Sequence, residues 1–162
     1  MTKYSLPSTS VLQGDTDGSR LKVGIIVAEF NEAITTNLLE GTIKALFDNN
    51  VRQENIFVVK VPGAFEIPLV SYRLANKNYY DVLICLGAVI RGETGHYDIV
   101  ASESAHGISR VALDIGIPII FGVLTTDNFQ QAVDRSGGKY GNKGYDCGIS
   151  AIKMANINLK LK

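Results

Sequence analysis

Short, almost continuous apolar runs recur along the chain and predict buried β-strands. They are rich in β-branched residues, and polar or glycine-containing segments separate them. Apolar side chains at every position, rather than at alternate positions, are typical of strands in a parallel sheet that is covered on both faces. Four such strands are predicted, at residues 21–27, 56–61, 82–87 and 117–124.

A helix with an unusually broad apolar surface is predicted after the first strand. Asn31 is a suitable N-cap for this helix, which runs to about Asp48. One contact with a sheet needs only a narrower apolar face, so the excess breadth also predicts an interface between subunits. The surface consists of Ile34, Leu38, Leu39, Ile43 and Leu46.

Four further helices continue the alternation. The first covers Ala64–Ala75 and tolerates Pro68, because a proline in the first turn removes no helical hydrogen bond. The second carries an apolar stripe. The third begins with a capping box, in which Asp127 is the N-cap and Gln130 lies three residues on. The last covers about Cys147–Leu159. The stripe of the second helix is formed by Val100, Ile108, Val111 and Ile115.

Alternating strands and helices predict a three-layer α/β/α sandwich around a four-stranded parallel sheet, a flavodoxin-like architecture. We expect residues 19–162 to form a single domain and residues 1–18 to form a mobile N-terminal arm, with an added edge strand as the alternative for the arm. In such sheets, ligands bind outside the carboxyl ends of the strands. The candidate chemistry is therefore expected where the predicted strands end.

Composition and charge narrow the function classes. The chain has 162 residues, of which 46% are hydrophobic and 20% charged, as in an ordinary globular domain. The 16 basic and 16 acidic residues cancel and form no basic run, which argues against nucleic-acid binding. The longest apolar runs are about half as long as a membrane span. Cys85 and Cys147 belong to no CxxC pair and are interpreted as reduced core thiols.

These features predict a cytoplasmic protein with no membrane partner. Residues 1–18 contain no apolar segment of the signal-peptide kind. An organellar leader is the disfavoured alternative, because the segment is short and contains acidic residues.

The ends of the first two predicted strands carry aromatic and acidic side chains. Phe30 follows the first strand and is either a core residue or a platform on which a ligand ring stacks. The segment 62–68 follows the second strand, and the free N–H groups at a helix start suit a polar ligand. Glu66 in this segment either complements the helix dipole or accepts hydrogen bonds from ligand hydroxyls.

The third predicted strand leads into Gly87–His96, a segment with three glycines before a helix. Its backbone N–H groups suit an anion, but it has neither the Walker pattern nor GxGxxG, so nucleoside triphosphates and dinucleotides lack support. His96 is a candidate proton shuttle near neutral pH, with a structural role as the alternative. His106 lies along the helix in another direction and is assigned a structural or surface role.

Basic residues and glycines follow the fourth predicted strand. Arg135 is suited to clamp a phosphate, because a guanidinium group forms bidentate hydrogen bonds. The alternative for this region is a solvated loop with scattered charges. The glycines in residues 137–144 predict a bent link rather than a continuous helix.

Five motifs, taken together in their order and spacing, resemble the lumazine synthase family. The resemblance covers the chain from about Lys22 to the C-terminus, and its specificity comes from the five motifs in register rather than from any one of them. The motifs are Phe30-Asn31, the segment Pro62–Pro68, the segment Gly87–Asp98, the segment Phe121–Thr126, and Arg135 with Gly141–Gly144.

The resemblance implies a reaction of riboflavin biosynthesis. The family condenses 5-amino-6-(D-ribitylamino)uracil with 3,4-dihydroxy-2-butanone 4-phosphate and releases phosphate and water. It implies that Phe30 stacks on the pyrimidine ring and that Glu66 binds a ribityl hydroxyl, while backbone groups bind the ring and the ribityl chain. The implied substrate-binding set also includes Asn31, Ala64, Phe65, Ala88, Val89 and Ile90.

The phosphate and the protons are implied to be handled by a second group of residues. Arg135 would hold the phosphate together with backbone N–H groups near Glu93 and Thr94. His96 would shuttle protons during imine formation and phosphate elimination. The residues implied to reach the site from the adjacent subunit are Phe121, Arg135 and Lys143.

The resemblance also implies an assembly. Members form pentamers, and some assemble twelve pentamers into an icosahedral shell. The short link at residues 137–142 resembles the shell-forming type and favours a 60-mer, in which an enclosed riboflavin synthase is a candidate partner. The reaction needs proton transfers and a held anion but no redox agent, and the sequence has no cluster resembling metal ligands, so neither a cofactor nor a metal is expected.

Two rival functions stand beside this interpretation. A related riboflavin synthase would dismutate two lumazines, but it has no phosphate substrate and therefore no need for the Arg135 clamp. A shell or flavin-binding protein without activity would not need the complete set of motif residues.

Overall fold

The computed structural model describes residues 10–162 and contains a four-stranded parallel sheet in the order β2-β1-β3-β4. The first residues of three strands are aligned, since Val23 pairs with both Ile56 and Val82. The predicted sheet is confirmed. Its strands are β1 (Val23–Ala28), β2 (Ile56–Val61), β3 (Val82–Ile90) and β4 (Ile119–Thr126).

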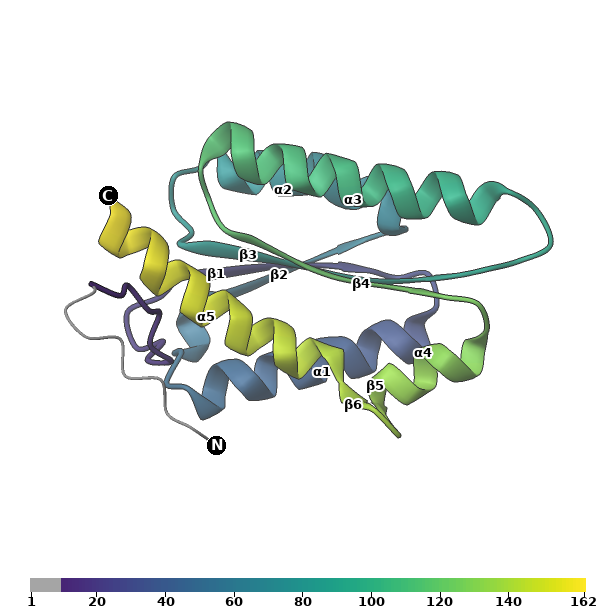
Figure 1. Cartoon of the computed structure of the whole chain (residues 1–162), viewed down its shortest axis with the longest axis horizontal. Coiled ribbons are helices and arrows are strands. Elements are labelled where there is room, and N and C mark those ends of the chain that lie inside the picture. The colour runs from purple at the N-terminus through teal and green to yellow at the C-terminus, as the bar shows by residue number, and fades with distance from the viewer. Residues whose placement is uncertain (1–9) are drawn as a thin grey trace.

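Helices cover both faces of the sheet, which confirms the predicted three-layer sandwich (Figure 1). Helices α2 and α3 lie on one face, and α1, α4 and α5 lie on the other. The helices are α1 (Glu32–Asp48), α2 (Ile67–Ala75), α3 (His96–Ile115), α4 (Phe129–Arg135) and α5 (Lys143–Leu161). Short 3₁₀ turns occupy Gln53–Asn55 and Ala64–Glu66, and a small hairpin is formed by β5 (Ser136–Gly138) and β6 (Gly141–Asn142).

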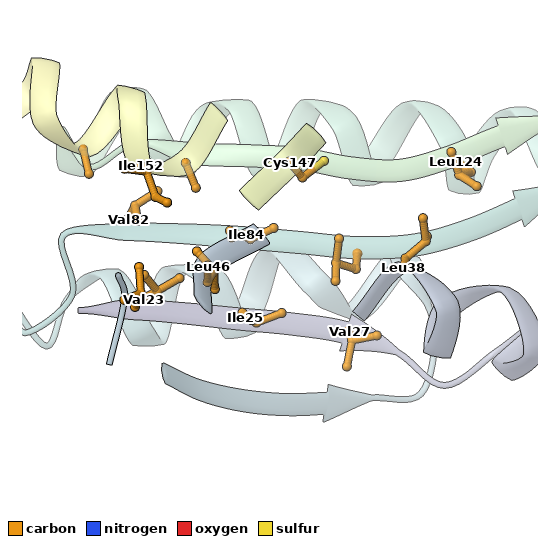
Figure 2. Close-up of a cluster of buried hydrophobic side chains, with 14 of the residues drawn as sticks. Val23, Ile25, Val27, Leu38, Leu46, Val82, Ile84, Leu124, Cys147 and Ile152 are labelled. Carbon is orange, nitrogen blue, oxygen red and sulfur yellow. The ribbon is translucent and has the colours of Figure 1, made fainter. Parts of the chain in front are cut away.

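The larger part of the core lies between the sheet, α1 and α5. Figure 2 shows side chains of the central strands meeting those of both helices, with Ile25 and Ile84 on the sheet opposite Leu46 and Ile152. Burial of such side chains is the main stabilising contribution to the fold. Helix α5 runs from the carboxyl ends of the strands back to the opposite end of the sheet (Figure 1).

The broad apolar surface of α1 is used within the chain rather than exposed to a partner. Helix α1 packs on the sheet and also on α5, where glycines allow a close approach. A Cβ added to Gly144 would collide with the carbonyl oxygen of Leu38, and one added to Gly148 would lie 2.6 Å from the Cβ of Ala45. The second contact explains the breadth of the surface, so that breadth gives no support to a subunit interface on α1.

Two predicted helix caps are wrong in detail. Asn31 lies at the N-cap position of α1 but in the left-handed region (φ 60°, ψ 48°), and its side chain makes no cap bond. It donates instead to the carbonyl oxygen of Ala88 at 2.8 Å. The N-cap of α4 is Asn128 rather than Asp127, because the helix begins one residue later than predicted; its side chain accepts from the N–H of Gln131 at 2.9 Å.

Two other helix starts differ from the prediction. The segment predicted as one helix from Ala64 begins with a 3₁₀ turn, and α2 starts at Ile67 with Pro68 in its first turn. The last helix begins at Lys143 instead of Cys147. Its start is set by Asn142, whose side chain accepts from the N–H of Gly144 at 2.8 Å.

The described part of the N-terminal segment, residues 10–18, lies against α5 and contains no strand. Asn156 donates to the carbonyl oxygens of Asp15 and Asp17 at 3.1 and 3.0 Å. Lys160 lies 3.4 Å from a carboxylate oxygen of Asp15. Residues 1–9, the first half of the predicted mobile arm, lie outside the described residues. Within residues 10–162, no helix is long and apolar enough to cross a membrane.

Candidate functional site

Two hollows lie near the carboxyl ends of the strands. We call the larger one, of about 780 Å³, the main cleft; it lies between the ends of β1, β2 and β3 and the start of α3. We call the other, of about 530 Å³, the edge hollow; it lies along β4, the last strand of the sheet, beside α4 and α5.

The main cleft brings together most of the predicted substrate-binding residues from four separate parts of the chain. Asn31 and Glu93 do not line it, and Asn31 acts on the cleft only through its hydrogen bond to Ala88. The predicted residues that line the main cleft are Phe30, Ala64, Phe65, Glu66, Ala88, Val89, Ile90, Thr94 and His96.

Aromatic rings stand on the rim of the main cleft. Phe30 is 72% exposed, so it is not a core residue, and Phe65 is also exposed. Two backbone hydrogen bonds fix the position of Phe30. The N–H of Glu29 donates to the carbonyl oxygen of Val61 at 2.8 Å, and the N–H of Phe30 donates to that of Pro62 at 3.1 Å. A ring held in this way and left open to solvent on one side is suited to stack on a planar ligand.

Small residues keep the wall of the main cleft open. A Cβ at Gly63 would lie 3.1 Å from a carboxylate oxygen of Glu66, and one at Gly87 would contact Ala64. The side chains of Ala88 and Val89 are buried at the end of β3. This wall therefore offers backbone groups and apolar surface rather than charge.

The loop after β3 carries His96 to the opposite side of the main cleft. His96 is the first residue of α3, and its backbone N–H donates to the hydroxyl of Thr94 at 3.4 Å. Arg91 begins the loop, and its backbone N–H donates to the carbonyl oxygen of Thr126 at 2.9 Å. Hydrogen bonding to Asp127 is the main cause that raises the pKa of Arg91.

The edge hollow gathers the cationic residues. Arg135 lies in the last turn of α4, where it donates to the carbonyl oxygen of Gln131 at 3.2 Å. Its guanidinium carbon lies 5.1 Å from the centre of the Tyr140 ring. Lys143 and Phe121 line the same hollow, and Phe121 is 38% exposed. The arrangement gathers two positive charges and an aromatic ring, with Asp146 as the one acidic side chain on the lining.

One chain does not bring His96 and Arg135 into the same hollow. His96 lines only the main cleft, whereas Arg135 lines only the edge hollow. The residues that the sequence suggested would come from a neighbouring subunit are those that lie apart from the main cleft in this chain.

Sequence reasoning missed several lining residues. Val100 lies one turn after His96 on the helix and shares its side, a spacing that could have identified it, whereas no such spacing points to Tyr97. Tyr140 and Asp146 line the edge hollow, and Tyr140 is the only aromatic residue in the glycine-rich link at residues 136–144.

The assignments of the other histidine and of the cysteines are confirmed. The side chain of His106 is 80% exposed and lies 3.9 Å from Glu103 on the surface of α3. Cys85 and Cys147 are both buried and unpaired. Burial raises the pKa of the Cys85 thiol to about 12 and that of the Cys147 thiol to about 11. Within residues 10–162, no group of three or more His, Cys, Asp or Glu side chains could hold a metal ion.

The parallel sheet, covered by helices on both faces, and the two hollows at its strand ends define an α/β protein of the flavodoxin-like class with candidate sites for small molecules. A profile of the family described as 6,7-dimethyl-8-ribityllumazine synthase matches residues 20–158. The match spans most of the chain, and the chain belongs to this family. It is accordingly a transferase of riboflavin biosynthesis, acting at the condensation that forms 6,7-dimethyl-8-ribityllumazine. The resemblance inferred from the five motifs is confirmed.

Proposed function

We propose that the condensation takes place at a site completed by two subunits, in which the main cleft of one chain faces the edge hollow of the next. The separation of His96 from Arg135 in a single chain carries this proposal. A reaction that expels phosphate needs both a proton carrier and a held anion at one place, and two copies of the chain supply them together.

The main cleft is the place proposed for the pyrimidine substrate. Phe30 stacks on the ring, and backbone groups of Ala64, Phe65, Val89 and Ile90 bind the ring and the ribityl chain. The exposure of Phe30 and the apolar, charge-free wall at Ala88 support this assignment, because an uncharged ring and its hydroxyls need hydrogen bonds rather than ion pairs.

Glu66 completes the pyrimidine subsite by accepting a hydrogen bond from a ribityl hydroxyl. Its carboxylate lies on the lining of the main cleft, beside Gly63. Asn31 contributes indirectly, since it fixes the carbonyl group of Ala88 at the end of β3.

The phosphate substrate is placed where the two chains meet. Arg135 and Lys143 of the neighbouring chain bind its phosphate, together with the backbone near Glu93 and Thr94, and a guanidinium group suits this task because it forms paired hydrogen bonds. His96 then moves protons as the amine adds to the carbonyl, as water leaves to form the imine, and as phosphate departs.

The proposed assembly is a pentamer, and twelve pentamers form a shell of 60 chains. The link between α4 and α5 supports the shell, since it is a short hairpin whose turns use Gly137 and Gly141 at positive φ. The proposed compartment is the cytoplasm, and a riboflavin synthase enclosed in the shell is the proposed partner. Light scattering that returned the mass of a single pentamer would contradict the shell.

Subunit complementation tests the shared site. His96→Ala and Arg135→Ala chains are unfolded together and refolded as a mixture, and formation of the fluorescent lumazine is followed. Random mixing pairs an intact main cleft with an intact edge hollow at about a quarter of the sites, so the mixture should have about a quarter of the wild-type activity, at least roughly twofold above His96→Ala and far above Arg135→Ala. Activity equal to the mean of the separate variants would contradict a shared site.

Substrate controls separate the rival functions. The wild-type protein should form lumazine from the two substrates and should not convert lumazine alone into riboflavin. An assembled protein that forms no lumazine would instead support a shell or flavin-binding role.

A further inference from the structure

The loop that carries the catalytic side of the main cleft is exposed and has few hydrogen bonds of its own. Residues 91–96 are all exposed. Cβ atoms added at Gly92 or Gly95 would meet nothing within 4 Å, so packing does not hold the loop. The N–H of Asp98 donates to the carbonyl oxygen of Gly95 at 3.1 Å, which fixes only the start of the helix.

Arg91 is the residue that connects both ends of this loop to the rest of the fold. Its Nε donates to Asp127 at 3.2 Å, just after β4, and its Nη1 donates to Asp98 at 3.4 Å, in the first turn of α3. Its guanidinium carbon also lies 4.1 Å from the centre of the Tyr97 ring. One planar group therefore contacts the strand end on one side of the loop and the helix start on the other.

The geometry requires an arginine rather than any cation. A guanidinium group can donate in two directions at once while its face stacks on an aromatic ring, whereas an ammonium group is a single flexible point charge. Isolated exposed ion pairs contribute little to stability, so the value of these contacts lies in fixing a geometry rather than in the free energy of folding.

We propose that Arg91 is a positioning residue, which holds residues 92–95 and the start of α3 so that His96 and the loop backbone face the phosphate substrate. Arg91 does not line the main cleft, and its guanidinium group is engaged by Asp98, Asp127 and the Tyr97 ring rather than pointing to a ligand. The effect of Arg91 on the substrate rests on the proposed function, whereas its effect on the position of the loop does not. The partner of Arg91 after β4, Asp127, directly precedes Asn128, which is the N-cap of the helix that carries Arg135.

Kinetics of Arg91→Met and Arg91→Lys test the effect on substrate. The loop backbone is proposed to bind the phosphate, and a misplacement of about an ångström costs up to about a hundredfold, so KM for the phosphate substrate should rise roughly tenfold to a hundredfold in Arg91→Met. Arg91→Lys should restore only a small part of the lost affinity for the phosphate substrate, because lysine restores the charge but cannot donate to Asp98 and Asp127 from one planar group. The KM for the pyrimidine substrate should change less than about twofold, since the backbone groups proposed to bind it come before Arg91 in the sequence and lie outside the loop that Arg91 holds.

Two further variants sharpen this test. Arg110→Met removes an exposed arginine that pairs with Asp114 at 3.3 Å on the same helix, far along the chain from the loop, and should leave both KM values unchanged. Asp127→Asn should raise KM for the phosphate substrate on its own but add little to Arg91→Met, because residues that share one interaction are not additive. Equal rises of both KM values, with a lower melting temperature, would mean a general structural role and would overturn the proposal.

Hydrogen exchange tests the loop without any substrate. The amides of Arg91 and Asp98 are both hydrogen-bonded, to Thr126 and Gly95, and should exchange roughly tenfold faster in Arg91→Met but not in Arg110→Met. Unchanged exchange together with unchanged KM values would overturn the proposal. If the wild-type protein forms no lumazine, the proposed function fails, and the exchange rates alone decide whether Arg91 holds the loop.

Discussion

The main cleft and the edge hollow of one chain differ in what they offer a ligand. The main cleft presents an exposed aromatic ring, backbone groups and a small-residue wall, with Glu66 as its single acidic side chain. The edge hollow presents Arg135 and Lys143 around Phe121 on the last strand of the sheet. The first is suited to recognise the shape and hydroxyls of a neutral molecule, and the second is suited to hold an anion.

This difference indicates how a small fold can serve a two-substrate reaction. In the proposed assembly, the cations of one chain meet His96 of the next, so two differently built surfaces of one small chain serve the two substrates.

Removing the cation of the edge hollow gives the largest expected effect. Arg135→Ala should lower kcat/KM for the phosphate substrate roughly a hundredfold to a thousandfold, as the loss of a group that holds developing charge does in other enzymes. Lys139→Ala is the matched control, since Lys139 also lies 5.2 Å from the Tyr140 ring but does not line the hollow. Normal steady-state kinetics in Arg135→Ala would remove the phosphate-binding role from the edge hollow.

Removing His96, the proposed proton carrier of the main cleft, should give a smaller effect. His96→Ala should slow turnover only moderately, roughly tenfold to a hundredfold, because most of the acceleration is expected from bringing two substrates together. Added imidazole should restore part of the lost rate. His106→Ala, on the exposed surface of the same helix, should behave like the wild type. A complete loss of turnover in His96→Ala would mean that proton transfer, rather than positioning, dominates.

The two buried thiols, Cys85 and Cys147, give the smallest expected effect. Cys85 lies under α2, 3.3 Å from the hydroxyl of Ser71, and Cys147 lies beneath Gly122, where an added Cβ would come within 2.9 Å of its sulfur. Since burial raises the pKa of Cys85 to about 12 and that of Cys147 to about 11, both should be neutral and resist thiol reagents at pH 8. Cys147 should react first as the pH rises.

The same thiols make the stability of the fold depend on alkaline pH. An unfolded thiol ionises near pH 8.5, well below the raised pKa of the folded one, so the stabilising difference is complete below that pH and is lost as the pH rises toward about 11 and 12. Urea unfolding should show a free energy that falls above pH 9. A Cys85→Ala, Cys147→Ala double variant should lose much of this slope, and an unchanged slope would contradict the assignment.

Local patterns sufficed to predict the sheet and most of the main cleft. The second predicted strand, residues 56–61, has the observed bounds of β2, because a proline and a glycine follow its apolar run directly. The third was predicted to end at Gly87, whereas Ala88–Ile90 continue the pairing with β4. The rule that ligands bind at strand ends then located Phe30 and His96 without any side-chain geometry.

Features that depend on distant partners could not be predicted. Asn31 resembles a helix cap, but its side chain is taken by a carbonyl group 57 residues away. The contacts of Arg91 could not be predicted, because one of its partners, Asp127, comes close only when β3 and β4 pair. The breadth of the α1 surface suggested a partner chain, since the glycines that bring α5 against it give no local hydrophobic signal.

The course of α5 has a practical consequence for attaching this protein to other materials. The helix starts at the edge hollow and, with 19 residues at 1.5 Å each, ends about 28 Å away, at the opposite end of the sheet (Figure 1). A dye, a surface anchor or a peptide joined after Lys162 would therefore begin far from the reacting molecules. Lys162 is thus a favourable position for display or immobilisation with the pockets left open to solution.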